Sequence, residues 1–253
     1  MTQPKFRLFG GPNGSGKTHV FKQFKRRGYI HTEIYVNADK IEAGLKKKGK
    51  FYFNAFRVKV DDADFKNHIT SSGLYNKIGD KSFIDHFSIL SGVLHIGKNV
   101  SINSYHASFI ASYLAERLFL TGQSFAFETV MSHSSKVDLI HLAKANGYKT
   151  YLYFIFLDDI STNVARVQLR VLQGEHTVEE ETIKSRAPRT FELLPHAFAV
   201  ADSAYIIDNS IEAISILSKE SSAITVSESY PEIIKPAVDI ILKQAKRKYK
   251  IKS

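Results

Sequence analysis

The chain has 253 residues, no cysteine and a formal net charge of +10 at pH 7. The absence of cysteine excludes disulfides and thiolate metal sites, and the length suits an α/β domain with a large buried core. The excess of positive charge fits nucleotides, nucleotide sugars and nucleic acids alike, since all of them are anionic.

The first residues and the apolar runs bear on location. Residues 1–7 lack the apolar core of a signal peptide. The longest aliphatic and aromatic run, Tyr151–Leu157, has seven residues, far fewer than a membrane span needs. We therefore expect a cytoplasmic protein that does not enter a membrane.

A phosphate-binding loop opens the chain. Gly11–Thr18 reads Gly-Pro-Asn-Gly-Ser-Gly-Lys-Thr, between an expected strand at Lys5–Phe9 and an expected helix at Thr18–Arg27. Backbone N–H groups of such a loop converge on phosphates, Lys17 reaches the β- and γ-phosphates, and the Thr18 hydroxyl can ligate Mg²⁺. The residues expected to bind ATP are Gly11, Pro12, Asn13, Gly14, Ser15, Gly16, Lys17 and Thr18.

A second strand is expected next, at Glu33–Val36, and a helix follows at Lys40–Lys47. Residues 48–100 show no sustained period, and we interpret them as an insertion that shapes a pocket. The elements expected inside it are a strand or hairpin arm at Phe51–Val60 and short helices at Asp64–Leu74 and Ser82–Leu90.

Regular periodicity returns at residue 101. The expected helices are Ser101–Leu120, Ser134–Asn146, Ser161–Leu172 ended by Gly174, one from Thr177 to Leu193, and Glu232–Lys246; the expected strands are Ser124–Phe127, Thr150–Leu157 and, as the last, Ala204–Ile207. Thr177–Glu180 has the spacing of a capping box. This alternation predicts an α/β fold in one domain, 1–253: a P-loop NTPase-like parallel sheet with helices on both faces and a helical lid at 161–194.

Acidic residues follow three of the expected strands. They are Asp39, Glu128 and the pair Asp158-Asp159. In an open α/β sheet ligands bind beyond the carboxyl ends of the strands, where a carboxylate can accept a proton from a hydroxyl or hold Mg²⁺. We favour such a function for Asp39 and Glu128, and helix capping or loop solvation for Asp158 and Asp159.

Arginines gather in the expected lid. Arg166 and Arg170 share a helix face, and Arg186 and Arg189 lie on the next helix. A hairpin would bring them together around a triphosphate, whose transferring phosphoryl group they would stabilise. A solvated face paired with Glu179–Glu181 and Glu192 is an equal alternative. The six basic residues of Lys243–Ser253 favour a solvated helix end over a nucleic-acid contact.

The chain resembles the zeta toxin family of P-loop kinases. Besides the loop, the resemblance rests on Val-Asn-Ala-Asp at 36–39, Phe-Glu-Thr-Val-Met-Ser at 127–132 and a long match over Asn163–Ser210. This last block is the specific part, because many families share the phosphate loop.

The resemblance implies transfer of the ATP γ-phosphate to a hydroxyl of a nucleotide sugar, typically the 3′-hydroxyl of UDP-N-acetylglucosamine. It implies that Lys17 and Thr18 bind ATP and Mg²⁺, that Asp39 is the base, and that Glu128 contacts substrate or metal. Arg166, Arg170 and Arg186 would belong to the segment that closes over the phosphates. A toxin of this type could have an antitoxin protein as its partner.

The sequence also departs from the family pattern. Relatives often carry a substrate-binding arginine after the strand-end glutamate, whereas Thr129–Ser132 supplies none, and His133 could substitute. Gly174-Glu175-His176 stands where Gly-Gly-His is common, and 48–100 is unmatched. The acceptor is therefore open. The alternatives are a kinase for another nucleotide or a polynucleotide end, or a regulatory nucleotide-binding module without chemistry.

Overall fold

The computed structural model describes residues 2–172, 178–246 and 248–252. Its contacts divide the chain into a first unit, Met1–Glu33 with Ser124–Ser253, and a second unit, Ile34–Gln123. The insertion expected at 48–100 lies within the second unit, which extends beyond it at both ends. The reading of 1–253 as one domain stays a prediction, and each unit is described by itself.

The first unit is built on a sheet with the strand order β11-β10-β9-β8-β7-β1-β6. The strands are β1 (Lys5–Gly10), β6 (Phe125–Glu128), β7 (Lys149–Phe156), β8 (Ser203–Asp208), β9 (Ile214–Glu220), β10 (Ala223–Val226) and β11 (Lys250–Lys252). β6, β1, β7 and β8 are parallel, whereas β9 is antiparallel to β8 and β10. The α/β prediction is confirmed, with two corrections: the sheet is mixed, and Ala204–Ile207 is not its last strand.

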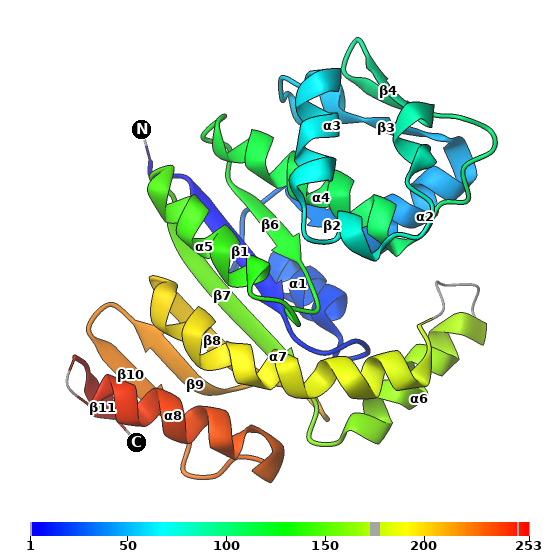
Figure 1. Cartoon of the computed structure of the whole chain (residues 1–253). Coiled ribbons are helices and arrows are strands. Elements are labelled where there is room, and N and C mark those ends of the chain that lie inside the picture. Colours follow the sequence, from blue (N-terminus) through cyan, green and yellow to red (C-terminus); the bar gives the residue numbers. More distant parts are fainter. Residues whose placement is uncertain (1, 173–177, 247, 253) are drawn as a thin grey trace. The chain divides into compact units, whose positions relative to one another are not determined.

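Helices cover both faces of this sheet (Figure 1). They are α1 (Lys17–Arg26), α5 (Ser135–Ala145), α6 (Ile160–Leu172), α7 (Glu180–Val200) and α8 (Lys235–Ala245), the last preceded by the 3₁₀ turn Glu232–Ile234. Ring contacts identify the faces, because successive strand residues point to opposite sides. Tyr153 of β7 meets Phe24 of α1 at 5.7 Å, whereas Phe154 meets Phe191 of α7 at 5.8 Å. The core therefore has two aromatic layers.

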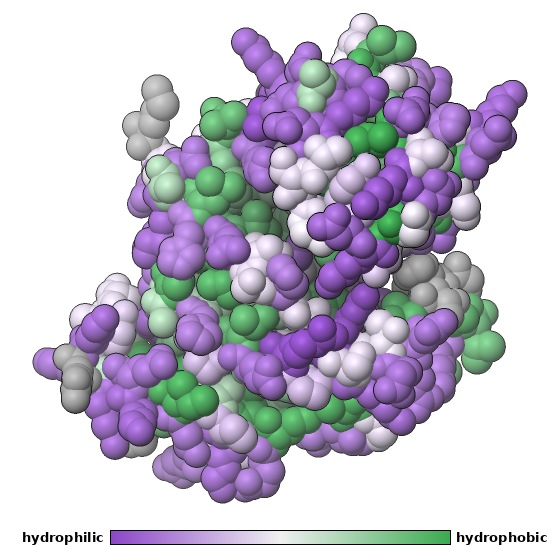
Figure 2. Space-filling view, in the orientation of Figure 1, coloured by the Kyte–Doolittle hydropathy of each residue, from purple (hydrophilic) through white to green (hydrophobic). Residues whose placement is uncertain are grey.

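The helices α6 and α7 form the expected hairpin. Val164 and Val167 of α6 pack with Ile183 of α7 in one buried cluster. Gly174 and Thr177, the expected stop and cap, lie outside the described residues. α7 runs past the expected end at Leu193, through Pro188 and Pro195, because its last turns bury Leu194, Ala197 and Phe198, and this packing outweighs the helix-breaking effect of proline. Hydrophilic residues predominate on the outward side of α7 (Figure 2).

The second unit has its own small sheet and an aromatic core. Its elements are β2 (Ile34–Asn37), α2 (Ala38–Lys48), β3 (Lys50–Tyr52), the 3₁₀ helix Phe53–Phe56, α3 (Asp62–Ser71), the 3₁₀ helices Tyr75–Lys77 and Ser82–His86, β4 (Phe87–Leu90), β5 (Val93–Ile96) and α4 (Ser104–Phe119). β3, β5 and β4 form an antiparallel sheet in that order. The strand expected at Phe51–Val60 ends at Tyr52. The helix expected at Ser82–Leu90 is a 3₁₀ helix that ends at His86, and the residues after it form β4.

The loop between β1 and α1 is held in place by two asparagines of neighbouring elements. Asn163 of α6 donates its Nδ2 hydrogen to the Asn13 carbonyl at 2.7 Å, and Asn209 after β8 donates to the Ser15 carbonyl at 2.8 Å. Both asparagines are buried. A Cβ on Gly14 would lie 2.3 Å from the Asn163 carbonyl oxygen, and one on Gly16 would lie 2.3 Å from Nδ2 of Asn209. The close approach requires glycine, and both glycines also have positive φ, 75° and 86°.

This clamp makes a first prediction. Asn209→Ala should leave the Ser15 carbonyl without its buried donor, at a cost of about 1–3 kcal/mol. We expect the melting temperature to fall by several degrees, at about 2–4 °C per kcal/mol for a chain of this size, and amide exchange at residues 13–16 to accelerate.

Asn146→Ala is the matched control, because the Asn146 amide also donates to a backbone carbonyl, that of Leu142 at 2.9 Å, but on an exposed helix end. Wild-type exchange rates at residues 13–16 in Asn209→Ala would contradict the clamp.

Candidate phosphate-binding site

The centre of the site is the ammonium group of Lys17. α1 begins at this residue, after Gly16 in a left-handed conformation. Lys17 Nζ donates to the carbonyl oxygens of Gly11 at 2.9 Å and Pro12 at 2.7 Å, and the side chain is 7% exposed. The loop thus holds a buried positive charge at the N-terminus of a helix, where the helix dipole also favours an anion.

The next residue connects α1 to the end of β6. The hydroxyl of Thr18 donates to Glu128 Oε2 at 2.8 Å, although the two residues lie 110 positions apart in the chain. Burial raises the pKa of the Glu128 carboxyl, while the charge of Lys17, the hydrogen bond from Thr18 and the charge of Arg170 act in the opposite direction. The charges of Lys17 and Arg170 and the hydroxyl of Thr18 thus all act on the carboxyl group of Glu128.

Arg166 lies on the same helix as Arg170 but has a different set of contacts. Its guanidinium donates to the carbonyl oxygens of Asn209 and Ser210, at 3.1–3.4 Å. A Cβ on Gly16 would lie 4.0 Å from Arg166 Nη1. Arg166 is half-buried and borders the phosphate loop. Its hydrogen bonds to residues 209 and 210 connect α6 to the chain segment that follows β8.

The other residues expected to contact the acceptor or the phosphates are Thr129, His133 and Arg186, and their contacts are with other parts of the first unit. The Thr129 backbone N–H donates to the Phe9 carbonyl at 3.0 Å, and its hydroxyl accepts from the Met131 N–H at 3.2 Å. His133 is exposed, and its Nδ1 accepts from the Ser135 N–H at 3.2 Å at the start of α5. Arg186 is half-buried on α7. A substrate-binding role for Thr129 and His133, and a catalytic one for Arg186, stay predictions.

Asp39 belongs to the second unit, in the first turn of α2. The cap of this helix is Asn37, whose side chain accepts from the Lys40 N–H at 3.0 Å. The Asp39 carboxylate is exposed and is not needed as the cap, so it is available for other chemistry. Its role as a base stays a prediction. By contrast, Asp159 does cap α6, as expected, since its carboxylate accepts from the Ser161 N–H at 3.0 Å.

Sequence reasoning missed the clamp residues Asn163 and Asn209, although both lie in the block that carries the family resemblance. It also missed Lys136, whose ammonium lies over the Phe127 ring at 5.7 Å and whose pKa is lowered by burial. Phe127 and Glu128 point to opposite faces of the sheet, so Lys136 lies on the face away from Glu128.

The residues present fit a nucleoside triphosphate and Mg²⁺. Lys17 supplies the positive charge at the start of α1, and the Thr18 hydroxyl with the Glu128 carboxylate supplies hard oxygen donors. Within residues 2–172, 178–246 and 248–252, no group of three or more His, Cys, Asp or Glu side chains forms a metal site by itself.

Sequence comparisons find little. No model of a known protein family matches the chain. An uncharacterized protein of Haemophilus influenzae (strain ATCC 51907 / DSM 11121 / KW20 / Rd) is 32% identical over 62 residues, which are 24% of this chain and 44% of that protein. The chain thus spans less than half the length of this relative.

Structural comparisons find more. Crystal structures of AvrRxo1-ORF1:AvrRxo1-ORF2, one with sulphate ions and one with ATP, contain a chain similar to this one, with TM-scores of 0.56 and 0.57 at 15% and 14% identity. The match covers 94% of this chain and 64% of that chain. A structure from the PezAT chromosomal toxin-antitoxin system of Streptococcus pneumoniae has a TM-score of 0.48 at 14% identity, over 98% of this chain and 87% of that one.

The likeness to the AvrRxo1 complex extends over nearly the whole chain, and at this level of identity it concerns the fold. Together with the phosphate loop between β1 and α1, it confirms the predicted fold, a largely parallel sheet flanked by helices with the loop at the end of its first strand.

Proposed function

We propose that the chain is an ATP-dependent kinase that transfers the γ-phosphate to a hydroxyl of a small molecule, a nucleotide sugar such as UDP-N-acetylglucosamine. The observation that carries the proposal is the Thr18–Glu128 hydrogen bond beside the buried ammonium of Lys17. This contact places a hydroxyl and a strand-end carboxylate, both of the kind that ligates Mg²⁺, next to a buried ammonium group at one loop. The AvrRxo1 complex with ATP supports a nucleotide in the corresponding fold.

The chain's own residues would divide the work as follows. The loop amides and Lys17 would bind the β- and γ-phosphates, and Thr18 with Glu128 would hold Mg²⁺, which would supply positive charge to neutralise the phosphates. Asp39 accepts the proton of the acceptor hydroxyl as its oxygen bonds to the γ-phosphorus and the bond to ADP breaks. Arg166, Arg170 and Arg186 stabilise the charge of the transferring group.

The proposal extends to partners. The AvrRxo1-ORF1:AvrRxo1-ORF2 crystals contain two proteins, and an antitoxin-like partner for this chain is the corresponding expectation. In the part of the chain that the structure describes, no helix is both long and apolar enough to cross a membrane.

The test of the proposal is transfer of label from [γ-³²P]ATP to a panel of nucleotide sugars, nucleotides and oligonucleotide ends. We expect labelled UDP-N-acetylglucosamine or a related nucleotide sugar. Lys17→Ala should lower the rate by at least about a hundredfold, because the loop loses its cation. Lys22→Ala is the matched control, since Lys22 is an exposed lysine of the same helix.

Three results would change the assignment. Label on an oligonucleotide end would make the chain a polynucleotide kinase. Binding of ATP without transfer to any acceptor would favour a regulatory nucleotide-binding module. Activity of Lys17→Ala within a few-fold of the wild type would remove the loop from the mechanism.

The role of Asp39 has a test of its own. Asp39→Asn keeps the shape of the side chain but cannot accept the proton, so phosphorylation of the acceptor should fall by roughly 10²–10⁴-fold with ATP affinity nearly unchanged. ATP titration and steady-state rates on the same preparation measure both quantities. Asp85→Asn is the matched control, because it changes an exposed carboxylate that caps no helix. Asp61 is unsuitable as a control because its side chain caps α3. Weaker ATP binding with an unchanged rate at saturation would make Asp39 a nucleotide or metal contact instead.

A further inference from the structure

One face of the strands β8, β9 and β10 is open to water in the first unit. α7 and α8 lie on the other side of these strands (Figure 1). Burial alternates along β9 accordingly: Leu217 and Lys219 are buried, whereas Ser218 is half-buried and Glu220 is exposed. This alternation is typical of an antiparallel sheet with one covered and one solvated face. We call the solvated side the open face.

Three aromatic rings are stacked in one row across the open face and its continuation on β7 and β1. Phe9 of β1 pairs with Tyr153 of β7, which pairs with Tyr205 of β8. The ring centroids are 4.7 Å and 5.2 Å apart, with interplanar angles of 18° and 9°. The Tyr205 hydroxyl donates to Glu220 Oε1 at 2.8 Å, so the last ring of the row is held in place.

The next two positions of the row carry small side chains. Ser218 of β9 pairs with Tyr205, and Thr225 of β10 pairs with Ser218. In the part of the chain that the structure describes, Tyr153 is the one ring stacked on half-buried Tyr205. Neighbouring strands lie about 4.8 Å apart, close to the spacing of the stacked rings. A planar group above Ser218 would therefore extend the row by stacking on the outer side of Tyr205.

Lysines border the row on β11, the outermost strand. The sequence favoured a solvated helix end for this basic segment, but its last described residues pair with β10 instead. Lys250 is paired with Ala223 and Lys252 with Thr225, so both lysines belong to the open face. Both are exposed.

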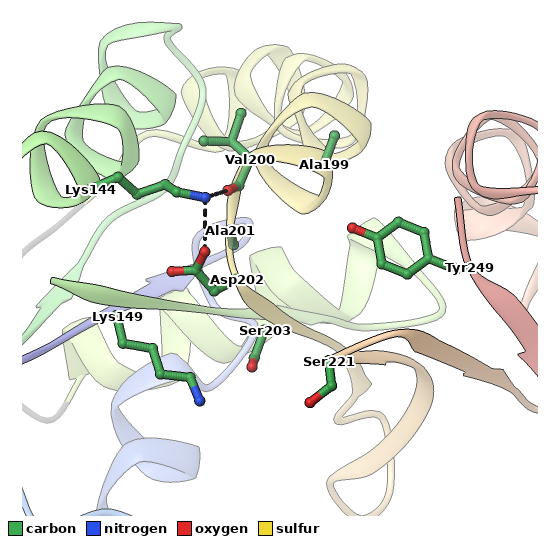
Figure 3. Close-up of a pocket in the computed structure, with 9 residues that line it drawn as sticks. All are labelled: Lys144, Lys149, Ala199, Val200, Ala201, Asp202, Ser203, Ser221 and Tyr249. Carbon is green, nitrogen blue, oxygen red and sulfur yellow. Dashed lines mark hydrogen bonds and ion pairs between the residues drawn. The ribbon is translucent and has the colours of Figure 1, made fainter. Parts of the chain in front are cut away.

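A third lysine, Lys149, lies at the start of β7. Figure 3 shows its side chain on the opposite side of the sheet from Lys144 and the end of α7. Its ammonium lies 5.7 Å from the centre of the Tyr151 ring. On this side of β7–β11 the one carboxylate is that of Glu220, so the three lysines leave a net charge of +2.

We propose that the open face binds single-stranded nucleic acid. One base stacks on Tyr205 above Ser218, and the lysines of β7 and β11 contact phosphates of the backbone. β7 and β11 are four strand spacings apart, about 19 Å, so the lysines bind successive phosphates of an extended strand and need not converge on one anion. Aromatic rings with a basic border are the combination that binds single strands without sequence preference.

The proposal is independent of the kinase activity, because none of these residues lies in the phosphate loop. Its test is the fluorescence anisotropy of a labelled oligothymidylate of about twelve nucleotides, titrated with the full chain. Tyr205→Leu should weaken binding by about 5- to 150-fold, since the stacking surface is lost. Tyr205→Phe is the matched control, because it keeps the ring and should bind like the wild type.

Two further variants examine the space above Ser218 and the lysines. Ser218→Tyr places a ring where the base would stack and suits a strand, so it should weaken binding as much as Tyr205→Leu. Lys250→Gln should reduce the slope of log Kd against log salt by about 0.7, because one phosphate contact is lost. Lys243→Gln is its control, since it removes the same charge from exposed Lys243 of α8. Melting temperatures verify that all variants are folded.

A second set of titrations separates this surface from other binding modes. Oligouridylate in place of oligothymidylate shows whether RNA or DNA binds more tightly, and either order supports the proposal. Equal binding of an abasic oligonucleotide or of an oligoglutamate of the same length would overturn it, because stacking would then contribute nothing. So would wild-type affinity in both Tyr205→Leu and Ser218→Tyr, or equal losses in Tyr205→Phe and Tyr205→Leu.

Lys17→Ala shows whether the oligonucleotide binds at the phosphate loop instead. We expect this variant to bind it as the wild type does, and a loss as large as that in Tyr205→Leu would overturn the proposal. Tyr205→Leu in turn should retain the affinity of the chain for ATP. Failure of the kinase proposal and failure of this one are therefore distinguishable.

Discussion

The backbone of the phosphate loop is the constraint on which the rest of the site depends. Its carbonyls at Asn13 and Ser15 are fixed by the buried amides of Asn163 and Asn209, which come from α6 and from the end of β8. The loop can approach these donors so closely only because Gly14 and Gly16 have no side chain. The orientation of the loop amides is thus set by elements that follow 150 and 194 residues later in the chain.

Much of this arrangement could be predicted from sequence. The loop pattern, the strand before it and the helix after it lie within one segment, so local pattern was enough. The sequence predicted that Glu128 lies at the same end of the sheet as the phosphate loop, because the carboxyl ends of parallel strands lie side by side. It did not predict the hydrogen bond between Thr18 and Glu128, since strand order does not determine which side-chain atoms meet. Asn163 and Asn209 could not be assigned, since an asparagine that bonds to a distant carbonyl has no periodic signature.

The missed strands have physical reasons too. The β4–β5 hairpin turns at Ser91-Gly92, with φ of 51° and 75°, and a Ser-Gly pair between two apolar runs is a signal that could have been used. The β9–β10 hairpin turns at Ser221-Ser222 without a glycine, so its turn carries no comparable signal. β11 is a three-residue edge strand with every side chain exposed, and a lysine-rich edge of this kind resembles a helix end in sequence.

The arginines of α6 show what the spacing of residues along a helix can and cannot predict. Arg166 and Arg170 are four residues apart on α6 and share a face, which suggested a common role. In the structure Arg166 donates to the carbonyls of Asn209 and Ser210, while Arg170 is a positive charge that acts on Glu128. Arg166 therefore binds the segment that contains a clamp residue, and its removal would disturb the loop as well as any phosphate above it. Arg170 acts on the carboxylate that receives the Thr18 hydroxyl. Helical spacing thus predicts that two side chains lie on the same face of a helix. The role of each charge depends on the residues of other elements that it contacts, which the spacing does not reveal.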